Sequence, residues 1–156
     1  MSPRVWWSLV ILAVVIVAGC AGNGPPPPTR VALDITASAD LNPDPDGRPS
    51  PVVLRLYELK TPSTFVNADF FALYDQPATA LGAELQGREE MLINPGESRS
   101  VEFSLAQETR HIGLLAAYRD LDRAVWRALL AVPPHETTPI TVDLGSKTIT
   151  ARVSDG

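Results

Sequence analysis

The amino-acid sequence predicts a mainly β domain, a two-sheet antiparallel sandwich of about eight strands with a small helical insert. Two observations support this prediction. From residue 30 onwards, short segments alternate apolar and polar residues and are separated by Pro, Gly, Asn and Asp, which is typical of half-buried strands joined by turns. One segment, at about residues 63–86, instead spaces its large apolar residues as a helix does. The chain of 156 residues fits one domain of this kind.

The strands are recognised by their alternation. Leu33 and Ile35 share one face of the segment Val31–Thr36, while Asp34 lies on the other face. Val52–Leu59 repeats the pattern, so both segments are expected to be half-buried strands. Turn residues at 94–97 and 145–147 separate later segments. The remaining expected strands are Glu90–Ile93, Arg99–Leu105, His111–Tyr118, Val125–Val132, Ile140–Leu144 and Thr148–Val153.

The helical insert carries much of the aromatic content of the domain. We expect Asn67 to cap a helix with Asp69 in its first turn, and Pro77 to end this helix or to begin another. Its apolar residues could dock onto one sheet as core, or the helices could form a surface for a partner. The large apolar residues at helical spacing are Phe65, Phe70, Phe71, Leu73, Tyr74, Leu81 and Leu85.

The first twenty residues have the pattern of a secretory signal. Arg4 precedes an apolar run over residues 5–17, and two small residues then lead to Cys20. The run is shorter than the roughly 20 apolar residues that a membrane-spanning helix needs. The residues before Cys20, the only cysteine, resemble the bacterial lipobox. We therefore expect residues 1–19 to be a cleaved lipoprotein signal peptide and Cys20 to be acylated, with several acyl chains that hold it stably in a membrane.

Residues 20–29 are expected to be a tether in front of the domain, which spans residues 30–156. Four consecutive prolines, Pro25–Pro28, favour an extended polyproline II segment. At about 3.1 Å per residue they would extend roughly 12 Å. A Pro-rich recognition motif is the alternative, but the position between an anchor and a strand favours a spacer.

The loop Ser38–Pro51 is the other irregular segment. It joins two well-patterned strands with 14 residues, four of them proline, and long loops in compact domains are usually functional or disordered. Proline restricts the backbone, so we expect this loop to be preorganised. Asp44, Asp46 and Gly47 resemble the start of a calcium loop, but the later acidic ligand is missing. We therefore expect neither a metal nor a cofactor.

Charge and motif content argue against several classes of function. The net charge is −5 and the basic residues are scattered, which disfavours nucleic-acid binding. The two histidines, His111 and His135, lack zinc-like spacing, and the sequence shows no phosphate-binding or nucleophile motif. The charged run 117–127 is expected to be a turn with ion pairs, with Trp126 packed in the core. We expect no enzyme.

Several collinear stretches resemble one known family. The lipobox is followed by Leu41–Asp44, Gly47–Pro51 and Val53–Lys60, and then by Ala68–Tyr74, Asn94–Glu97 and Ala117–Arg127. In this order they are similar to the outer-membrane lipoproteins of type VI secretion systems, the TssJ family. The resemblance implies a transthyretin-like sandwich, which agrees with the strand pattern. It also implies a structural role, in which the domain faces the periplasm and docks the periplasmic domain of the inner-membrane protein TssM.

The resemblance gives the Ser38–Pro51 loop a role, because the loop between the first two strands is a partner contact in that family. We expect Leu41 to be an apolar anchor, Asn42 and Asp44 to be hydrogen-bonding groups, and Arg48 to be a rim charge. Ala21, which follows the cysteine, implies the outer membrane. The predicted partner-binding set is Leu41, Asn42, Pro43, Asp44, Asp46, Gly47 and Arg48.

Two other functions stay open at this stage. A lipid-anchored sandwich could bind a carbohydrate or a hydrophobic small molecule, for which the aromatic residues Phe70, Phe71 and Tyr74 would have to line an open pocket. An envelope hydrolase with a dispersed catalytic site would need one of the two histidines beside a nucleophile in a cleft. Each alternative therefore makes a geometric demand that a structure can test.

Overall fold

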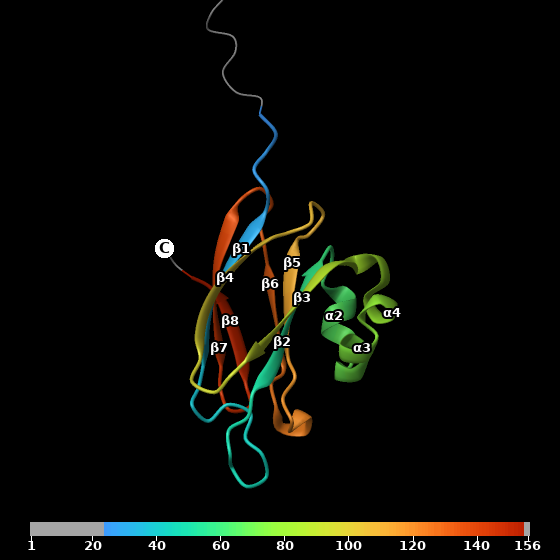
Figure 1. Ribbon diagram of the computed structural model, residues 1–156. Helices are drawn as coiled ribbons and strands as arrows, with labels where there is room; N and C mark the ends of the chain where they lie inside the picture. The colour runs from blue at the N-terminus through green and yellow to red at the C-terminus, as the bar shows by residue number, and fades with distance from the viewer. Residues whose placement is uncertain (1–23, 155–156) are drawn as a thin grey trace, which may run out of the picture.

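The computed structural model of the chain describes residues 24–154, which form two four-stranded sheets packed face to face (Figure 1). Three short helices cover the outer face of the second sheet (Figure 1). The predicted signal peptide, residues 1–19, and Cys20 lie outside the described residues. Within the described range, no helix has the length and apolar character to cross a membrane.

The first sheet has the strand order β4-β1-β7-β8 and the second has the order β3-β2-β5-β6. The strands of the first sheet are β1 (Arg30–Ala37), β4 (Ser98–Ser104), β7 (Thr137–Leu144) and β8 (Ile149–Val153). Those of the second sheet are β2 (Val52–Leu59), β3 (Leu85–Ile93), β5 (His111–Ala116) and β6 (Arg127–Ala131). These eight strands correspond to the eight that the sequence predicts.

One strand pair differs from the antiparallel prediction. β1 and β7 run parallel, with Leu33 opposite Ile140, whereas the other five strand pairs are antiparallel. Parallel neighbours need a long connection, and here the chain builds the whole second sheet between β1 and β7. As a result, Arg30 and Thr137 lie at one end of the sandwich, and Ala37 and Leu144 lie at the other.

The main core fills the space between the sheets. Leu33 and Ile35 are each 1% exposed, while Asp34 between them is exposed, so the predicted register of β1 is confirmed. Leu54 and Leu56 face the same core from β2. At about 25 cal/mol for each Å² of apolar surface buried, such side chains contribute about 1.5–3 kcal/mol each.

The helical insert packs on the outer face of the second sheet through a second hydrophobic cluster. Tyr57 faces this cluster, and its hydroxyl donates a hydrogen bond to the Leu73 carbonyl at 2.8 Å. Phe70 and Tyr74 pack against the same cluster. The expectation that the helices dock as core is therefore confirmed. The buried members are Tyr57, Leu59, Phe65, Leu73, Leu81 and Leu115.

The helix boundaries correct two sequence predictions. The helices are α2 (Ser63–Asn67), α3 (Phe70–Asp75) and α4 (Pro77–Leu81). Asp69, not Asn67, caps α3, because its carboxylate accepts a hydrogen bond from the Ala72 amide at 2.9 Å. Asn67 instead ends α2 and donates to the Ser63 carbonyl. After α4 a 3-10 turn leads directly into β3. This strand starts at Leu85 and not at the predicted Glu90, because its first residues already pair with the end of β2.

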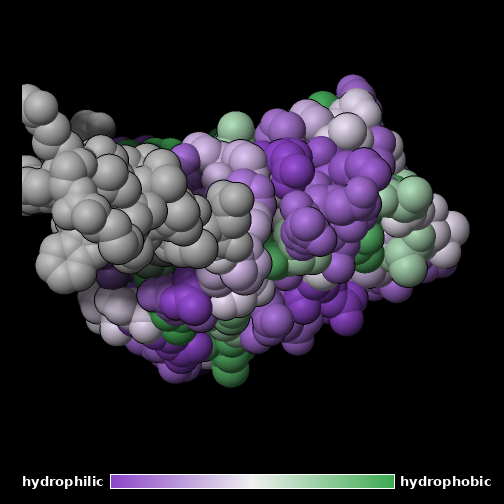
Figure 2. All heavy atoms as spheres, turned by 90° about the horizontal axis from the view of Figure 1, so that it is seen from above, coloured by the Kyte–Doolittle hydropathy of each residue, from purple (hydrophilic) through white to green (hydrophobic). Residues whose placement is uncertain are grey.

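Viewed from the end at which β1 begins, the visible surface is mostly hydrophilic, with small hydrophobic patches between polar residues (Figure 2). The large hydrophobic side chains that are exposed come from five different segments of the chain. They are Val66, Phe71, Leu92, Val125 and Val153.

Candidate functional site

The Ser38–Pro51 loop lies at the end of the sandwich opposite the point where the chain enters β1 (Figure 1). The 3-10 turn Leu121–Arg123 lies at the same end (Figure 1). β1 has eight residues, and a strand rises about 3.3 Å per residue. The entry of the predicted tether, at Arg30, is thus about 25 Å from the start of the loop.

Asn42 connects the base of this loop to two other segments. Its side-chain amide donates to the Pro51 carbonyl at 2.9 Å, and its side-chain oxygen accepts from the Arg119 amide at 2.8 Å. Its own backbone amide donates to the Ser146 carbonyl at 2.9 Å. The backbone of Asn42 has φ of 46°, a left-handed conformation that Asn tolerates better than most residues. Asn42 thus joins the loop to the segment after β5 through its side chain and to the β7–β8 hairpin through its backbone amide.

Two of the predicted partner-binding residues prove to be structural. We expected Leu41 to be an apolar anchor for a partner, a role that requires an accessible side chain, but it is 0% exposed and belongs to the main core. We expected Asn42 to offer hydrogen bonds to a partner, but it is buried and its amide is already engaged within the chain. The physical reason is the same for both, since the loop base is pulled into the sandwich and Ser50 donates back to the Leu41 carbonyl at 2.9 Å.

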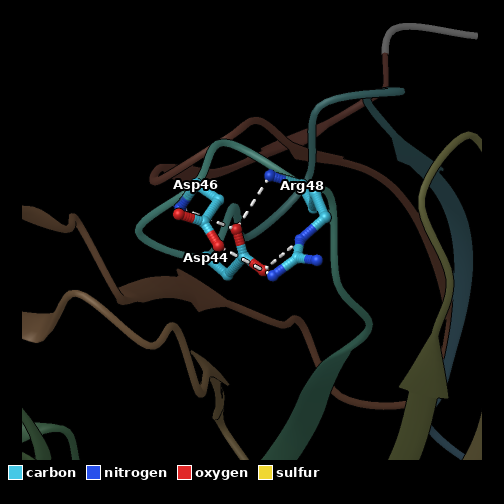
Figure 3. Close-up of polar contacts among 3 residues, drawn as sticks. All are labelled: Asp44, Asp46 and Arg48. Carbon is cyan, nitrogen blue, oxygen red and sulfur yellow. Dashed lines mark hydrogen bonds and ion pairs between the residues drawn. The ribbon is translucent and has the colours of Figure 1, made fainter.

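The loop tip is held by a small network of charged groups (Figure 3). The Asp44 carboxylate accepts hydrogen bonds from the amides of Asp46 and Arg48 and from the Arg48 side chain, each at 2.9 Å. Arg48 also donates to Asp46 at 2.8 Å. The backbone hydrogen bond from Arg48 is the main cause that lowers the pKa of Asp44. Gly47, with φ of 79°, supplies the left-handed turn that glycine favours.

The tip network supports the prediction of a preorganised loop and corrects one role within it. Asp44 satisfies its carboxylate inside the loop, so it is not a free hydrogen-bonding group. Asp46, Gly47 and Arg48 remain exposed, and Pro43 is half-buried. Among residues 24–154 the structure contains no group of three or more His, Cys, Asp or Glu side chains that could hold a metal ion.

A groove of about 430 Å³ lies beside the loop tip. Asp120 accepts a hydrogen bond from the Lys147 ammonium at 2.6 Å and lies 3.5 Å from the Arg123 guanidinium. The hydrogen bond from Lys147 is the main cause that lowers the pKa of Asp120. The groove is lined by Pro43, Asp44, Pro45, Arg119, Asp120, Arg123 and Lys147.

The groove joins residues that the sequence analysis treated separately. The prediction of a turn with ion pairs in residues 117–127 is confirmed, and Trp126 packs against both hydrophobic clusters. Arg119 and Lys147, however, were missed as neighbours of the loop. The alternation of apolar residues locates strands but not which turns meet at one end, and Lys147 reaches the loop only because β7 runs parallel to β1.

The opposite end of the sandwich holds the last residues of the predicted tether. The amide of His135 donates to the Thr29 hydroxyl at 2.9 Å, and its ring Nδ1 lies 3.1 Å from the Pro27 carbonyl. Pro25–Pro28 pack beside Leu105 and Gln107 around a cavity of about 330 Å³. The proline segment therefore packs against the domain at this end.

The geometry does not meet the demands of the small-molecule alternative. Phe70 stacks on Tyr74 with ring centroids 5.2 Å apart, and it meets Trp126 edge to face at 5.3 Å. The Arg55 guanidinium lies 3.8 Å above the Tyr74 ring. These side chains pack on one another instead of lining an open pocket, and Phe71 alone projects, being 63% exposed.

Comparisons with known proteins place the chain among relatives. The family model described as type VI secretion lipoprotein, VasD, EvfM, TssJ matches residues 29–147. The T6SS lipoprotein TssJ1 from Pseudomonas aeruginosa is 44% identical, and its solved structure superposes with a TM-score of 0.80 over 83% of this chain and 99% of that chain. This likeness confirms the mainly β, two-sheet prediction. A search of the curated proteins found no match.

Two further solved structures contain a chain of the same fold. One is described as a type VI membrane complex, with 27% identity and a TM-score of 0.71 over 80% of this chain and 98% of that chain. The other is described as the T6SS protein TssM C-terminal domain from EAEC, with 24% identity and a TM-score of 0.67 over 81% of this chain and 99% of that chain. At that identity the second likeness concerns the fold alone.

Proposed function

Because the chain belongs to the type VI secretion lipoprotein family that includes TssJ, we propose that it is a non-catalytic subunit of the secretion membrane complex that docks the periplasmic domain of the inner-membrane protein TssM. Residues 1–19 are removed on export, and the acylated Cys20 anchors the protein in the outer membrane. Residues 20–29 then form the tether, and the sandwich from residue 30 onwards faces the periplasm.

The single observation that carries the docking proposal is the construction of the Ser38–Pro51 loop. Its base is fixed by Leu41 in the core and by the hydrogen bonds of Asn42. Its tip is closed by the bonds of Asp44 yet exposed to solvent. A surface segment held in one shape loses little conformational entropy when a partner binds, so a few contacts suffice for affinity.

The position of the loop supports the same proposal. The predicted tether enters the sandwich at Arg30, about 25 Å from the loop. A domain anchored through that end presents the loop on the side away from its own attachment, where a protein that reaches across the periplasm meets it. The partner contacts at the tip are Pro43, Asp46, Gly47 and Arg48.

The test replaces the tip without disturbing the base. We replace Asp44–Arg48 with Gly-Ser-Gly-Ser-Gly, which keeps the loop length and retains Leu41 and Asn42. A replacement that extended back to residue 39 would remove a core side chain and confound folding with binding. We expect the variant to unfold cooperatively with a Tm lowered by at most about 13 °C, because the four side-chain hydrogen bonds lost are exposed and worth about 1 kcal/mol or less each.

Binding to the TssM periplasmic domain, measured by titration calorimetry, should weaken at least tenfold, or about 1.4 kcal/mol. The control is Arg30→Glu, which changes an exposed side chain at the tether end of the sandwich and should leave binding within twofold of the parent. A folded tip variant that binds as tightly as the parent would place the contact surface elsewhere.

A further inference from the structure

The groove beside the loop tip carries more basic than acidic groups that are open to solvent. Its lining includes three cationic side chains, Arg119, Arg123 and Lys147, and two carboxylates, Asp44 and Asp120. Arg119 is exposed, and within residues 24–154 its guanidinium makes no ion pair at 4.0 Å or less. The Arg123 side chain is 79% exposed and shares Asp120 with Lys147.

The two carboxylates are already engaged. Asp44 accepts three hydrogen bonds, all from Asp46 and Arg48 within the loop tip. Asp120 is paired with Lys147 at 2.6 Å. The lining therefore carries one net positive charge, on a protein whose net charge is −5. The charge of Arg119 helps to lower the pKa of Asp44, but its guanidinium N–H donors make no salt bridge within the described residues.

We propose that this groove receives a carboxylate side chain of the docked periplasmic protein, held between the guanidinium groups of Arg119 and Arg123. The inference rests on the proposed docking function and adds the chemistry of the contact. Arginine suits this role because its planar fork of N–H donors matches a carboxylate. Pro43 and Pro45, which also line the groove, offer rigid apolar contact to the aliphatic part of the incoming side chain.

Charge and position select this occupant over an anionic lipid. The groove lies at the loop end, about 25 Å from the entry of the tether, so the headgroups of the anchoring membrane are out of reach of a domain held through that entry. The overall negative charge of the chain repels acidic surfaces in general, so a basic groove orients an acidic partner by attracting it at one point.

The test uses the full chain purified in detergent micelles and the TssM periplasmic domain of the same organism. We compare the parent with Arg119→Glu/Arg123→Glu and with the milder Arg119→Gln/Arg123→Gln. The matched control is Arg30→Glu/Arg152→Glu, which reverses the same number of exposed arginines, each in a surface ion pair away from the groove. Thermal unfolding of every variant checks the fold.

In 150 mM NaCl the variant Arg119→Glu/Arg123→Glu should bind the TssM periplasmic domain at least tenfold more weakly than the parent does. The variant Arg119→Gln/Arg123→Gln should bind with intermediate affinity, and the control should bind within twofold of the parent. Raising NaCl from 50 to 300 mM should weaken partner binding by the parent more than partner binding by Arg119→Gln/Arg123→Gln, because salt screens the attraction between exposed charges.

Four outcomes overturn the inference. If the glutamate pair binds within twofold of the parent while the tip replacement weakens binding, docking stands and the groove is not the contact. An equal loss in the control would mean that long-range charge acts instead of the groove. Arginine-dependent binding to anionic vesicles, with partner binding unchanged, would assign the groove to lipid. If the parent itself does not bind the partner, the docking proposal fails as well.

Discussion

Asn42 offers the sharpest test of how the loop end is assembled. Replacing it with Ala removes two side-chain hydrogen bonds, to the Pro51 carbonyl and from the Arg119 amide. Each is worth about 1 kcal/mol, with more at stake when the remaining partner is buried. Ala also tolerates the left-handed backbone, φ of 46°, less well than Asn, at a cost of about 1 kcal/mol. The expected loss is about 3 kcal/mol.

The companion variant Asn42→Gly separates the two contributions. Glycine adopts the left-handed backbone freely, so only the hydrogen bonds are lost and the expected destabilisation is about 2 kcal/mol. For a domain of about 130 residues, a loss of 3 kcal/mol corresponds to a fall in Tm of about 10 °C.

The assay is urea unfolding of a domain comprising residues 24–154, which contain both sheets and both hydrophobic clusters. The midpoint should fall in the order parent, Gly variant, Ala variant, with an unchanged slope. An Ala variant within about 0.5 kcal/mol of the parent would refute the role of Asn42 as the link between segments. Equal losses for Ala and Gly would refute the backbone argument.

Three further predictions address the insert, the loop tip and the anchor. Gly113→Ala should lower the unfolding free energy by about 1–3 kcal/mol, because a Cβ there would lie 2.6 Å from the buried Phe65 ring. In a double-mutant cycle, Phe65→Leu should relieve part of this loss, and purely additive effects of the two substitutions would contradict the close contact. The pKa of Asp44 is lowered in the folded protein, so its contribution to stability is present above the unfolded pKa of about 3.9 and is lost as the pH falls through the lower, folded value. In urea titrations, the difference in unfolding free energy between the parent and Asp44→Asn should therefore stay constant from pH 7 to about pH 5 and narrow below about pH 4. A difference that does not change below pH 4 would count against this role of Asp44. Cys20→Ser should abolish acyl labelling and recovery of the protein in the membrane fraction, since a hydroxyl does not replace the thiol in the acylation reaction. Unchanged labelling would reject the lipoprotein assignment.

The strands could be predicted from the sequence because half-burial leaves a direct trace. Leu33 and Ile35 alternate with Asp34, and the structure buries the first two and exposes the third. The parallel pairing of β1 with β7 could not be predicted in the same way. A half-buried strand alternates identically whether its neighbour runs parallel or antiparallel.

The loop shows where pattern reasoning fails for a physical reason. Leu41 is a single apolar residue in a polar segment, and that pattern fits an exposed anchor as well as a core side chain. Only the tertiary structure, which buries it completely, separates the two. Asn42 contacts the Arg119 amide across 77 positions of the chain, a link that no local pattern encodes.

The preorganised tip, by contrast, was predictable in outline from its prolines and glycine. The hydrogen bonds between Asp44 and Arg48 were not predictable, because Asp44, Asp46 and Gly47 also resemble the start of a calcium loop. The structure resolves the ambiguity by pairing the carboxylate with the arginine of its own loop.

The most direct test of the docking proposal is site-specific photo-crosslinking in cells that express the full chain and TssM. A photoreactive residue at the exposed Asp46 of the loop tip should give an adduct with TssM, whereas the same residue at the exposed Glu102 of β4, which pairs with Arg30 at the tether end, should give none. An adduct from Glu102 but not from Asp46 would contradict the account.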